Sequence, residues 1–356
     1  MRKTLHLRLA VLQLPRPLRT RGRRTLRRNR APGILAGVLA LSLAAAFAVR
    51  FLRGENPEGR RTFPALGTFA TVVVRAPEED IPGMMSAADS LLKHIDGELG
   101  RFSDTGQLRH LNTTGSISAE SELGRLARFS DTMVAATGGS FDPSLGALVE
   151  VWGFPGADSV PDPARINEAL TVTGWEDMVT ITEDSILLRS GGLLDFGAVA
   201  KGWAVDRTWT LLMEMGAEEC LVEVGGEVRC GSSTGRVWNI GVRHPRDDSL
   251  AGVVSITEGA VATSGDYECF FIENGVRYSH LLDRNTGYPS GTAAGATVVA
   301  QDCATADAMA TAAAVGGPDA AGFFPEELYT GMIVIVEDGQ GACRVHRFGE
   351  VPWAAE

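Results

Sequence analysis

The segment LLDFGAVAKGWAVD (residues 193–206) contains the change of pattern that decides how this chain folds. Its first apolar residues indicate a strand that ends at Asp195, and residues 198–215 then repeat apolar positions with helical spacing. A helix N-terminus offers free N–H groups and a partial positive charge, and Lys201 adds a full charge there. The segment therefore predicts a strand-to-helix junction suited to a phosphate. A purely structural role, with Asp195 capping the helix and Lys201 solvated, stays open at this point.

The pattern on either side of this junction indicates an α+β fold. Further helices are expected at residues 84–99, 121–137 and 303–315, where apolar positions recur with helical spacing or small residues predominate. Strands are expected at residues 68–74, 179–188 as a hairpin, 220–224, 237–242, 252–256, 269–272, 278–282, 296–300 and, as the last one, 332–338. Mixed short strands packed with helices favour a single large α+β domain over a doubly wound sheet.

The first fifty residues predict a segment for targeting or membrane anchoring. Residues 1–30 form a basic leader, and residues 31–50 contain nineteen successive residues without a charge. That length is close to the ~20 residues that span a bilayer as a helix. The positive flank is expected to stay in the cytoplasm, so the rest of the chain would lie outside it. Residues 51–61 are expected to form a linker, and residues 62–356 the folded domain.

A cleaved signal peptide is the competing interpretation of the same segment. Ala46, Phe47 and Ala48 resemble a small-x-small cleavage site. An uncleaved anchor would hold the domain on the outer side of a bacterial cell membrane, whereas cleavage would leave it secreted or periplasmic. No cysteine occurs before Cys220, which excludes a lipoprotein anchor on an N-terminal cysteine.

The charge of the chain is divided unevenly. Residues 1–53 hold thirteen Lys and Arg and no acidic residue, and the remainder holds 20 basic against 44 acidic residues, a net charge of −24. Such an acidic surface disfavours nucleic acid, which is bound through its phosphates. A phosphorylated ligand would need a metal ion or backbone N–H groups to offset the repulsion. The five cysteines include no C-x-x-C pair, so a zinc site is not expected.

Two further segments place turn residues where a backbone can approach a ligand closely. They are EVGGEVRCG (residues 223–231), with paired glycines after a strand, and ATSGDYECFF (residues 262–271), with a polar turn between strands. Taken alone, each segment is better explained by a plain turn. The residues concerned are Gly225, Gly226, Ser264, Gly265 and Asp266.

The segment DCATADAMATAAAVGG (residues 302–317) indicates a site for a hard cation. Asp307 and Thr311 are four residues apart on one predicted helix, so their oxygens face the same way. A carboxylate with a hydroxyl suits Mg²⁺, which prefers oxygen ligands and keeps several waters. The structural alternative is a capping or surface aspartate and a threonine bonded back to the helix backbone.

His280 is one of six histidines and lies in the apolar run YSHLL, just before the turn residues DRNTG. Its ordinary pKa of about 6.5 suits proton transfer at neutral pH. An isolated histidine in a strand is more often a satisfied core residue, so this residue does not decide the function by itself.

Together, eight segments in order resemble the FAD:protein FMN transferases of the ApbE family. They are LGTFATV, RFSDTGQLRHLN, FDPSLGALVEVWGF, DFGAVAKGWAVD, LVEVGGEV, TSGDY, YSHLLDRNTGYP and TADAMAT. The resemblance runs from about residue 66 to residue 317. Eight segments in the family's order are far more specific than any one of them.

The resemblance implies a domain that binds FAD and Mg²⁺ and cleaves the FAD pyrophosphate. FMN would then be attached through a phosphoester to a threonine of another protein, and AMP would leave. The acceptor implied is a membrane redox subunit with a D-[GAS]-[AS]-T-like motif, on the same side of the membrane as this domain.

The resemblance also implies roles for individual residues. His280 would take the proton from the acceptor hydroxyl, and Asp266 in the adjacent turn is our second candidate for that base. The backbone carbonyl of Ala198, with Asp307 and Thr311, matches a metal site, in which Ala310 stands where some relatives have a second carboxylate. The FAD-binding positions are Leu66, Phe102, Ser144, Leu145, Gly146, Asp195, Lys201, Gly225, Gly226, Ser264, Gly265 and Leu282.

Two other functions are compatible with the same residues. One is an FAD pyrophosphatase, in which water replaces the threonine and the products are FMN and AMP. The other is a non-catalytic, membrane-anchored FAD-binding protein. The intact TADAMAT segment and His280 argue against the second.

Overall fold

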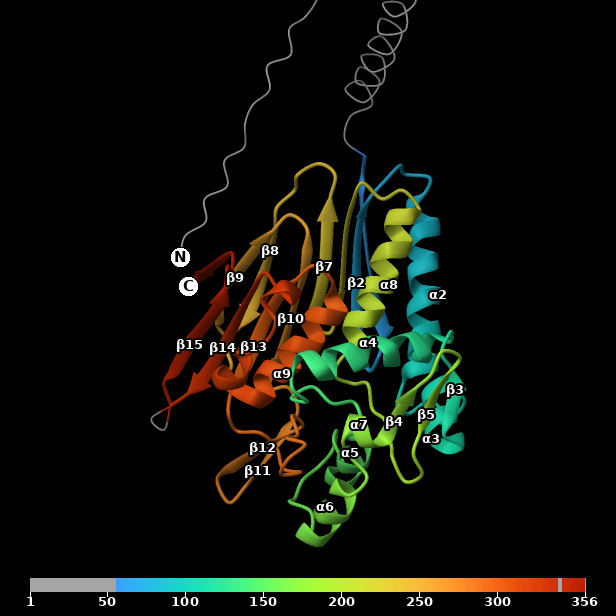
Figure 1. Cartoon of the computed structure of the whole chain (residues 1–356). Coiled ribbons are helices and arrows are strands. Elements are labelled where there is room, and N and C mark those ends of the chain that lie inside the picture. Colours follow the sequence, from blue (N-terminus) through green and yellow to red (C-terminus); the bar gives the residue numbers. More distant parts are fainter. Residues whose placement is uncertain (1–55, 339–340, 356) are drawn as a thin grey trace, which may run out of the picture. The chain divides into compact units, whose positions relative to one another are not determined.

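The core of the protein is one antiparallel sheet with the strand order β1-β2-β6-β7-β10-β13-β14-β15 (Figure 1). The computed structural model describes residues 56–338 and 341–355. All six residues of β13 are buried, so both faces of the sheet are covered at its centre. The strands are β1 (Glu58–Ala65), β2 (Thr68–Arg75), β6 (Glu219–Val224), β7 (Glu227–Ser232), β10 (Gly259–Gly265), β13 (Gly295–Ala300), β14 (Gly331–Glu337) and β15 (Cys343–Gly349).

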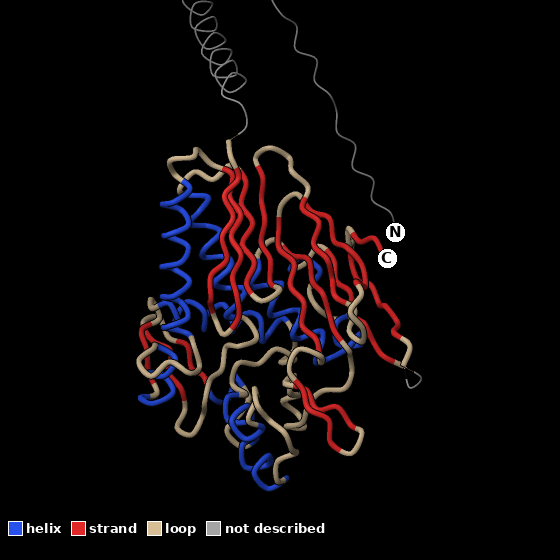
Figure 2. The backbone as a smooth tube through the Cα atoms, turned by 180° about the vertical axis from the view of Figure 1, so that it is seen from behind, coloured by secondary structure: helices blue, strands red, loops and turns tan. Residues whose placement is uncertain are grey.

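Three long helices cover one face of this sheet, and Figure 2 shows the sheet from the opposite side with the strands in front. They are α2 (Ile81–Leu99), α8 (Ala200–Glu214) and α9 (Cys303–Ala321). In α2, Ala88, Leu92 and Ile95 are fully buried at intervals of three and four residues, which gives the helix one apolar face. Because α8 packs on β6 and β7 and α9 on β10 and β13, the two helices meet over the middle of the sheet.

The crossing of α8 and α9 depends on small residues. A Cβ at Gly202 would lie 2.4 Å from the carbonyl oxygen of Cys303, so only glycine fits there. All alanines of α9 except Ala320 are buried, and Gly317, with a φ of 70°, interrupts the helix near its end. This close approach brings the first turn of α8 against Asp307, whose Oδ2 accepts a hydrogen bond from the Gly202 N–H at 2.9 Å.

A second, smaller sheet packs on the other face of the main sheet, in the order β16-β9-β8. Its residues Trp238 and Val254 share a core with Val73 and Cys230 of the main sheet. The strands are β8 (Trp238–Arg243), β9 (Leu250–Ile256) and β16 (Trp353–Ala355).

The remaining elements gather mainly at one end of the main sheet (Figure 1). There α5, α6 and the β11–β12 hairpin share a core around Trp152, whose ring stacks on Phe154 and Tyr278. The elements are α3 (Gln107–Thr114), β3 (Ser116–Ser118), α4 (Glu122–Ala136), α5 (Gly146–Trp152), α6 (Pro163–Leu170), α7 (Trp175–Met178), β4 (Val179–Ile181), β5 (Ser185–Leu188), β11 (Phe270–Glu273) and β12 (Val276–Ser279), with η1 (Glu326–Leu328) preceding β14.

The α+β prediction is confirmed, because an antiparallel sheet carries helices on one face. The helices expected at residues 84–99, 121–137 and 198–215 begin and end within three residues of α2, α4 and α8. Asn56–Glu356 forms one compact unit. No helix in the described part of the chain is long and apolar enough to cross a membrane. The basic leader and the apolar segment expected at residues 1–50 lie outside the described residues.

The strand expected to end at Asp195 is wrong. Leu193 makes only an isolated bridge with Leu145. The backbone of Leu194 is bonded instead to the side chain of Asn112, with both hydrogen bonds at 2.9 Å, and the Asp195 N–H donates to the Pro143 carbonyl at 2.8 Å. A side-chain amide and a loop thus satisfy the backbone groups that a neighbouring strand would otherwise pair.

Several other boundaries differ from the expected ones, and among them the helix expected at residues 303–315 continues to Ala321 as α9. The strand expected at residues 278–282 ends at Ser279, so His280 lies in a loop. Residues 58–61, expected in the linker, begin β1, and β14 is followed by β15 and β16. β1 and β15 are edge strands with many polar residues, and their pairing with a neighbour outweighs their weak local strand signal.

Candidate active site

One cavity of about 790 Å³ brings together most of the residues that the sequence singled out. That volume is in the usual range for a small-molecule site. Its lining comes from the β1–β2 turn, the end of α2, the loop before α5, the first turn of α8, the end of β10, the loop after β12 and α9. The predicted residues that line it are Leu66, Phe102, Leu145, Asp195, Ala198, Lys201, Ser264, His280, Leu282, Asp307 and Thr311.

Six predicted residues lie outside this lining: Ser144, Gly146, Gly225, Gly226, Gly265 and Asp266. Gly146 packs instead against the backbone of Leu193. Its N–H donates to the Leu193 carbonyl at 3.0 Å, and a Cβ at this position would lie 2.5 Å from that oxygen. Gly225 has a φ of 62°, and a Cβ there would lie 3.4 Å from Cδ of Lys201. These glycines shape the walls behind the cavity.

Lys201, Glu227 and Asp307 form a buried group of charges, called the lysine cluster below. The Nζ of Lys201 lies 2.5 Å from Oε1 of Glu227, and the two side chains are 23% and 0% exposed. Burial alone would lower the pKa of Lys201, but the nearby carboxylates outweigh it and hold that pKa above its ordinary value. Burial raises the pKa of Glu227 and of Asp307, while the charge of Lys201 opposes both shifts. Lys201 is therefore held as a cation at the cavity wall.

Glu227 was not among the residues predicted from the sequence. It follows the paired glycines of EVGGEVRCG directly, in a stretch whose sequence predicts a turn. The available signal was an acidic residue directly before Val228 at the start of a short strand, because a carboxylate in a buried strand needs a partner.

The three residues expected to hold a metal ion line the same cavity. Within residues 56–338 and 341–355, no group of three or more His, Cys, Asp or Glu side chains could hold such an ion. The donors available are the Asp307 carboxylate, the Thr311 hydroxyl and a backbone carbonyl at Ala198. Thr311 is already oriented, since its Oγ1 lies 3.0 Å from Oγ of Ser264. An all-oxygen set with one carboxylate fits a hard cation such as Mg²⁺.

His280 faces the same cavity from the loop that follows β12. Its Nδ1 lies 3.3 Å from the Cys269 carbonyl oxygen. A carbonyl only accepts, so this hydrogen bond requires the hydrogen on Nδ1 and leaves Nε2 unprotonated. Burial lowers the pKa of His280, and the charge of Lys201 lowers it further. The ring is therefore a neutral base near pH 7.

Asp266, the second candidate for the base, is bound elsewhere. Its two carboxylate oxygens accept from Nη1 and Nη2 of Arg246 at 2.7 and 2.8 Å. Arg246 also contacts Glu337 at 2.5 Å, which ties the end of β10 to the end of β14. A bidentate ion pair of this kind indicates a structural role for Asp266.

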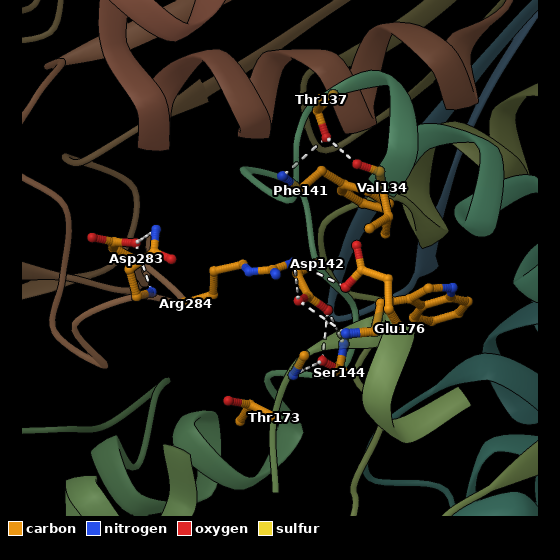
Figure 3. A network of polar contacts seen from close by, with 12 residues as sticks. Val134, Thr137, Phe141, Asp142, Ser144, Thr173, Glu176, Asp283 and Arg284 are labelled. Atoms are coloured by element: carbon orange, nitrogen blue, oxygen red, sulfur yellow. Dashed lines mark hydrogen bonds and ion pairs between the residues drawn. The ribbon is translucent and has the colours of Figure 1, made fainter. Parts of the chain in front are cut away.

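A polar network centred on Asp142, which lines the cavity, joins the loop before α5 to the turn after His280 (Figure 3). The Asp142 carboxylate accepts from the Ser144 N–H at 2.8 Å and from the Ser144 hydroxyl at 2.6 Å. It also lies 3.3 Å from Nη1 of Arg284, which comes from that turn. Burial raises the pKa of Asp142, although Ser144 and Arg284 oppose the shift. Ser144 thus supports the cavity wall from behind.

Comparison with known proteins gives consistent matches. Residues 66–335 match the ApbE family. Three proteins named FAD:protein FMN transferase are similar to this chain. The one from Rhodobacter capsulatus is 30% identical to it over 79% of this chain, and the one from Vibrio cholerae is 29% identical over 78%. The one from Treponema pallidum is 32% identical over 74% of this chain. The chain covers 56% of the length of the first of these proteins, and 87% and 80% of the other two.

Solved structures give the same result. The ApbE protein of Thermotoga maritima has a TM-score of 0.74 at 32% identity, covering 81% of this chain and 96% of that one. The flavin transferase ApbE of Vibrio cholerae has a TM-score of 0.72 at 26% identity, covering 82% of this chain and 97% of that one.

Proposed function

This chain belongs to the ApbE family, and from that membership we propose that it is an FAD:protein FMN transferase. It cleaves FAD and transfers the FMN part to a hydroxyl group of an acceptor protein. The observation that carries this proposal is that Lys201, Asp307, Thr311 and His280 all line one cavity. Transfer of a phosphoryl group needs charge neutralisation and a base for the acceptor, and both are present there.

The binding of FAD is assigned to two parts of the cavity. Phe102 is 79% exposed at the rim and, with Leu66 from the β1–β2 turn, offers apolar surface to the flavin ring. The first turn of α8, whose Ala200 and Lys201 line the cavity, presents the positive end of the helix dipole to the pyrophosphate, and the side chain of Lys201 adds a full positive charge. These contacts offset the repulsion between a pyrophosphate and an acidic domain.

Mg²⁺ is the metal that we propose for this site, held by Asp307, Thr311 and the carbonyl of Ala198. When bound, it would neutralise charge on the pyrophosphate as the phosphorus–oxygen bond breaks. Lys201 supplies a second positive charge to the same group.

His280 is assigned to the acceptor side of the reaction. Its Nε2 takes the proton of the threonine hydroxyl, and the hydroxyl oxygen attacks the phosphorus atom of the FMN part. The new bond is the threonine phosphoester. The bond broken joins that phosphorus to the bridging oxygen, which leaves with its electron pair on AMP.

Mass spectrometry of an acceptor protein tests this proposal directly. The acceptor proposed is a redox subunit with a D-[GAS]-[AS]-T-like motif, incubated with the domain, FAD and Mg²⁺. A mass gain of one FMN on a threonine is the expected result. Release of FMN and AMP without a modified acceptor would favour the pyrophosphatase, and bound FAD without turnover would favour a carrier.

The location of the domain is a separate proposal that rests on the first fifty residues. We propose that they anchor the domain to the cell membrane, with the domain outside the cytoplasm, or in the secreted or periplasmic space after cleavage. A reporter that is active only in the cytoplasm, fused after Glu356, should be silent. An active reporter would contradict this orientation.

A further inference from the structure

Glu227 lies behind the cavity and contacts it only through another residue. It is the first residue of β7 and is fully buried. Its Oε1 accepts from Nζ of Lys201 at 2.5 Å, while its Oε2 is buried without a hydrogen-bond partner. Lys201 lines the cavity and Glu227 does not. A carboxylate is therefore buried at this strand position with a single side-chain partner.

We propose that Glu227 is a positioning residue that fixes the ammonium of Lys201 at one place on the cavity wall and so sets the rate at which FAD is cleaved. This inference rests on the proposed function. Glu227 itself does not touch the substrate. Through one hydrogen bond it leaves the other two N–H groups of the ammonium free for phosphate oxygens.

The cost of burying Glu227 argues against a purely structural role. A buried ion pair is often no more stable than apolar side chains of the same size, and the unpartnered Oε2 adds a desolvation cost. Val224 lies directly opposite Glu227 on the neighbouring strand β6, on the same face of the sheet, and is apolar and fully buried, so an apolar residue would suit position 227. A carboxylate at position 227 is therefore best explained by the need to hold the Lys201 ammonium at one place in the cavity wall.

Lys201 needs such a partner because its side chain is long and flexible. Its stem passes close to Gly225, where a Cβ would lie 3.4 Å from Cδ. Asp307 does not replace Glu227, because its Oδ2 is bonded to the Gly202 N–H and it faces the proposed metal site. The contact with Glu227 is thus the one that holds the end of the lysine side chain.

The test measures release of AMP in a single turnover with saturating FAD and Mg²⁺, because AMP leaves whether the acceptor is a threonine or water. The variants are Glu227→Gln, Lys201→Met and the double variant. Glu223→Gln is the matched control, since Glu223 lies on the same hairpin and caps only the Gly226 N–H. Melting temperature and FAD affinity are measured on each protein.

Glu227→Gln should slow AMP release by about 10- to 100-fold, the usual worth of a well-placed charged hydrogen bond, while Glu223→Gln should match the wild type. In the Lys201→Met background, Glu227→Gln should change the rate by less than about 2-fold, since residues that act as one unit are not additive. The double variant should also melt at a higher temperature than Lys201→Met alone, because Glu227→Gln removes a buried carboxylate that has lost its partner.

Two results would overturn the positioning role. One is a wild-type rate for Glu227→Gln, and the other is an equal slowing in both backgrounds. If Glu227→Gln alone does not fold, a comparison of Lys201→Met with the double variant still decides between coupling and independence. A wild-type protein that releases no AMP would refute the proposed function, and the role of Glu227 would fall with it.

Discussion

The lysine cluster and the loop that carries His280 border the same cavity but are built in different ways. In the lysine cluster, Lys201 and Asp307 each have a polar partner within 3 Å, at 2.5 Å and 2.9 Å, and Asp307 and Glu227 are almost fully buried. His280 is half-buried, and its ring has one hydrogen bond, at 3.3 Å. The hairpin before it exposes Phe270 and Ile272, by 39% and 61%.

This difference corresponds to the two substrates of the proposed reaction. A pyrophosphate that is bound before the reaction benefits from charges already in place, because they need no reorganisation. An acceptor protein must reach the cavity from outside, so the base that serves it lies on an open side. Within the one displacement step, the cluster is therefore expected to stabilise the charge of the pyrophosphate, and the His280 loop to activate the acceptor hydroxyl.

Asp307→Ala should have the largest effect. It removes the only side-chain carboxylate of the proposed metal site, so turnover should fall by about 10³-fold or more. FAD should still bind through Phe102 and the first turn of α8. Single-turnover kinetics at several Mg²⁺ concentrations would measure the loss. Wild-type rates for this variant would remove Asp307 from the metal site.

His280→Ala should have the next largest effect, and it tests the role of the His280 loop separately from that of the lysine cluster. The transfer of FMN to an acceptor should slow by about 10²- to 10⁴-fold, the usual worth of a positioned base. Melting temperature and FAD affinity should change little, because the cluster stays intact. If His280 had a structural role, its replacement would instead lower the melting temperature and the FAD affinity along with the rate. A stable variant with the wild-type transfer rate would exclude His280 from the mechanism.

The pH dependence of transfer should follow the protonation of His280. Burial and the charge of Lys201 lower the pKa of this residue, and only the neutral ring accepts a proton. The rate should therefore stay constant at neutral pH and fall about tenfold per pH unit below a midpoint lower than about 6.5. Single-turnover rates from pH 5 to 8 would show it. A midpoint above pH 6.5, or the same profile in His280→Ala, would contradict this assignment.

Leu66→Asn should have the smallest effect. Leu66 lines the cavity with a φ of 47°, a conformation that costs a leucine about 1 kcal/mol and that asparagine adopts more readily. Relief of this strain should offset the apolar contacts that are lost, so the melting temperature should stay within a few degrees. FAD affinity should fall by about 3- to 10-fold, as expected from the loss of part of one apolar contact. If the FAD affinity, measured by titration, does not change, Leu66 does not contact FAD and contributes only to the structure of the β1–β2 turn.

Local patterns in the sequence were sufficient for the elements whose signal lies within one segment. Apolar periodicity located α2, α4 and α8, and the spacing of Asp307 and Thr311 placed both side chains on the same side of α9. The strand expected before Asp195 was wrong, since Asn112, more than eighty residues away, takes its hydrogen bonds. Sequence periodicity does not record such a partner.

The sequence by itself therefore determined the fold class, the helices α2, α4 and α8, the family, and a set of site residues most of which line the cavity. Only the tertiary structure decided that Glu227 pairs with Lys201, that Arg246 engages Asp266, and that His280 lies in a loop beyond the end of β12. The physical reason is that the energy of a buried charge depends on its partner in space. That partner comes from an element distant in the sequence, so no local pattern contains it.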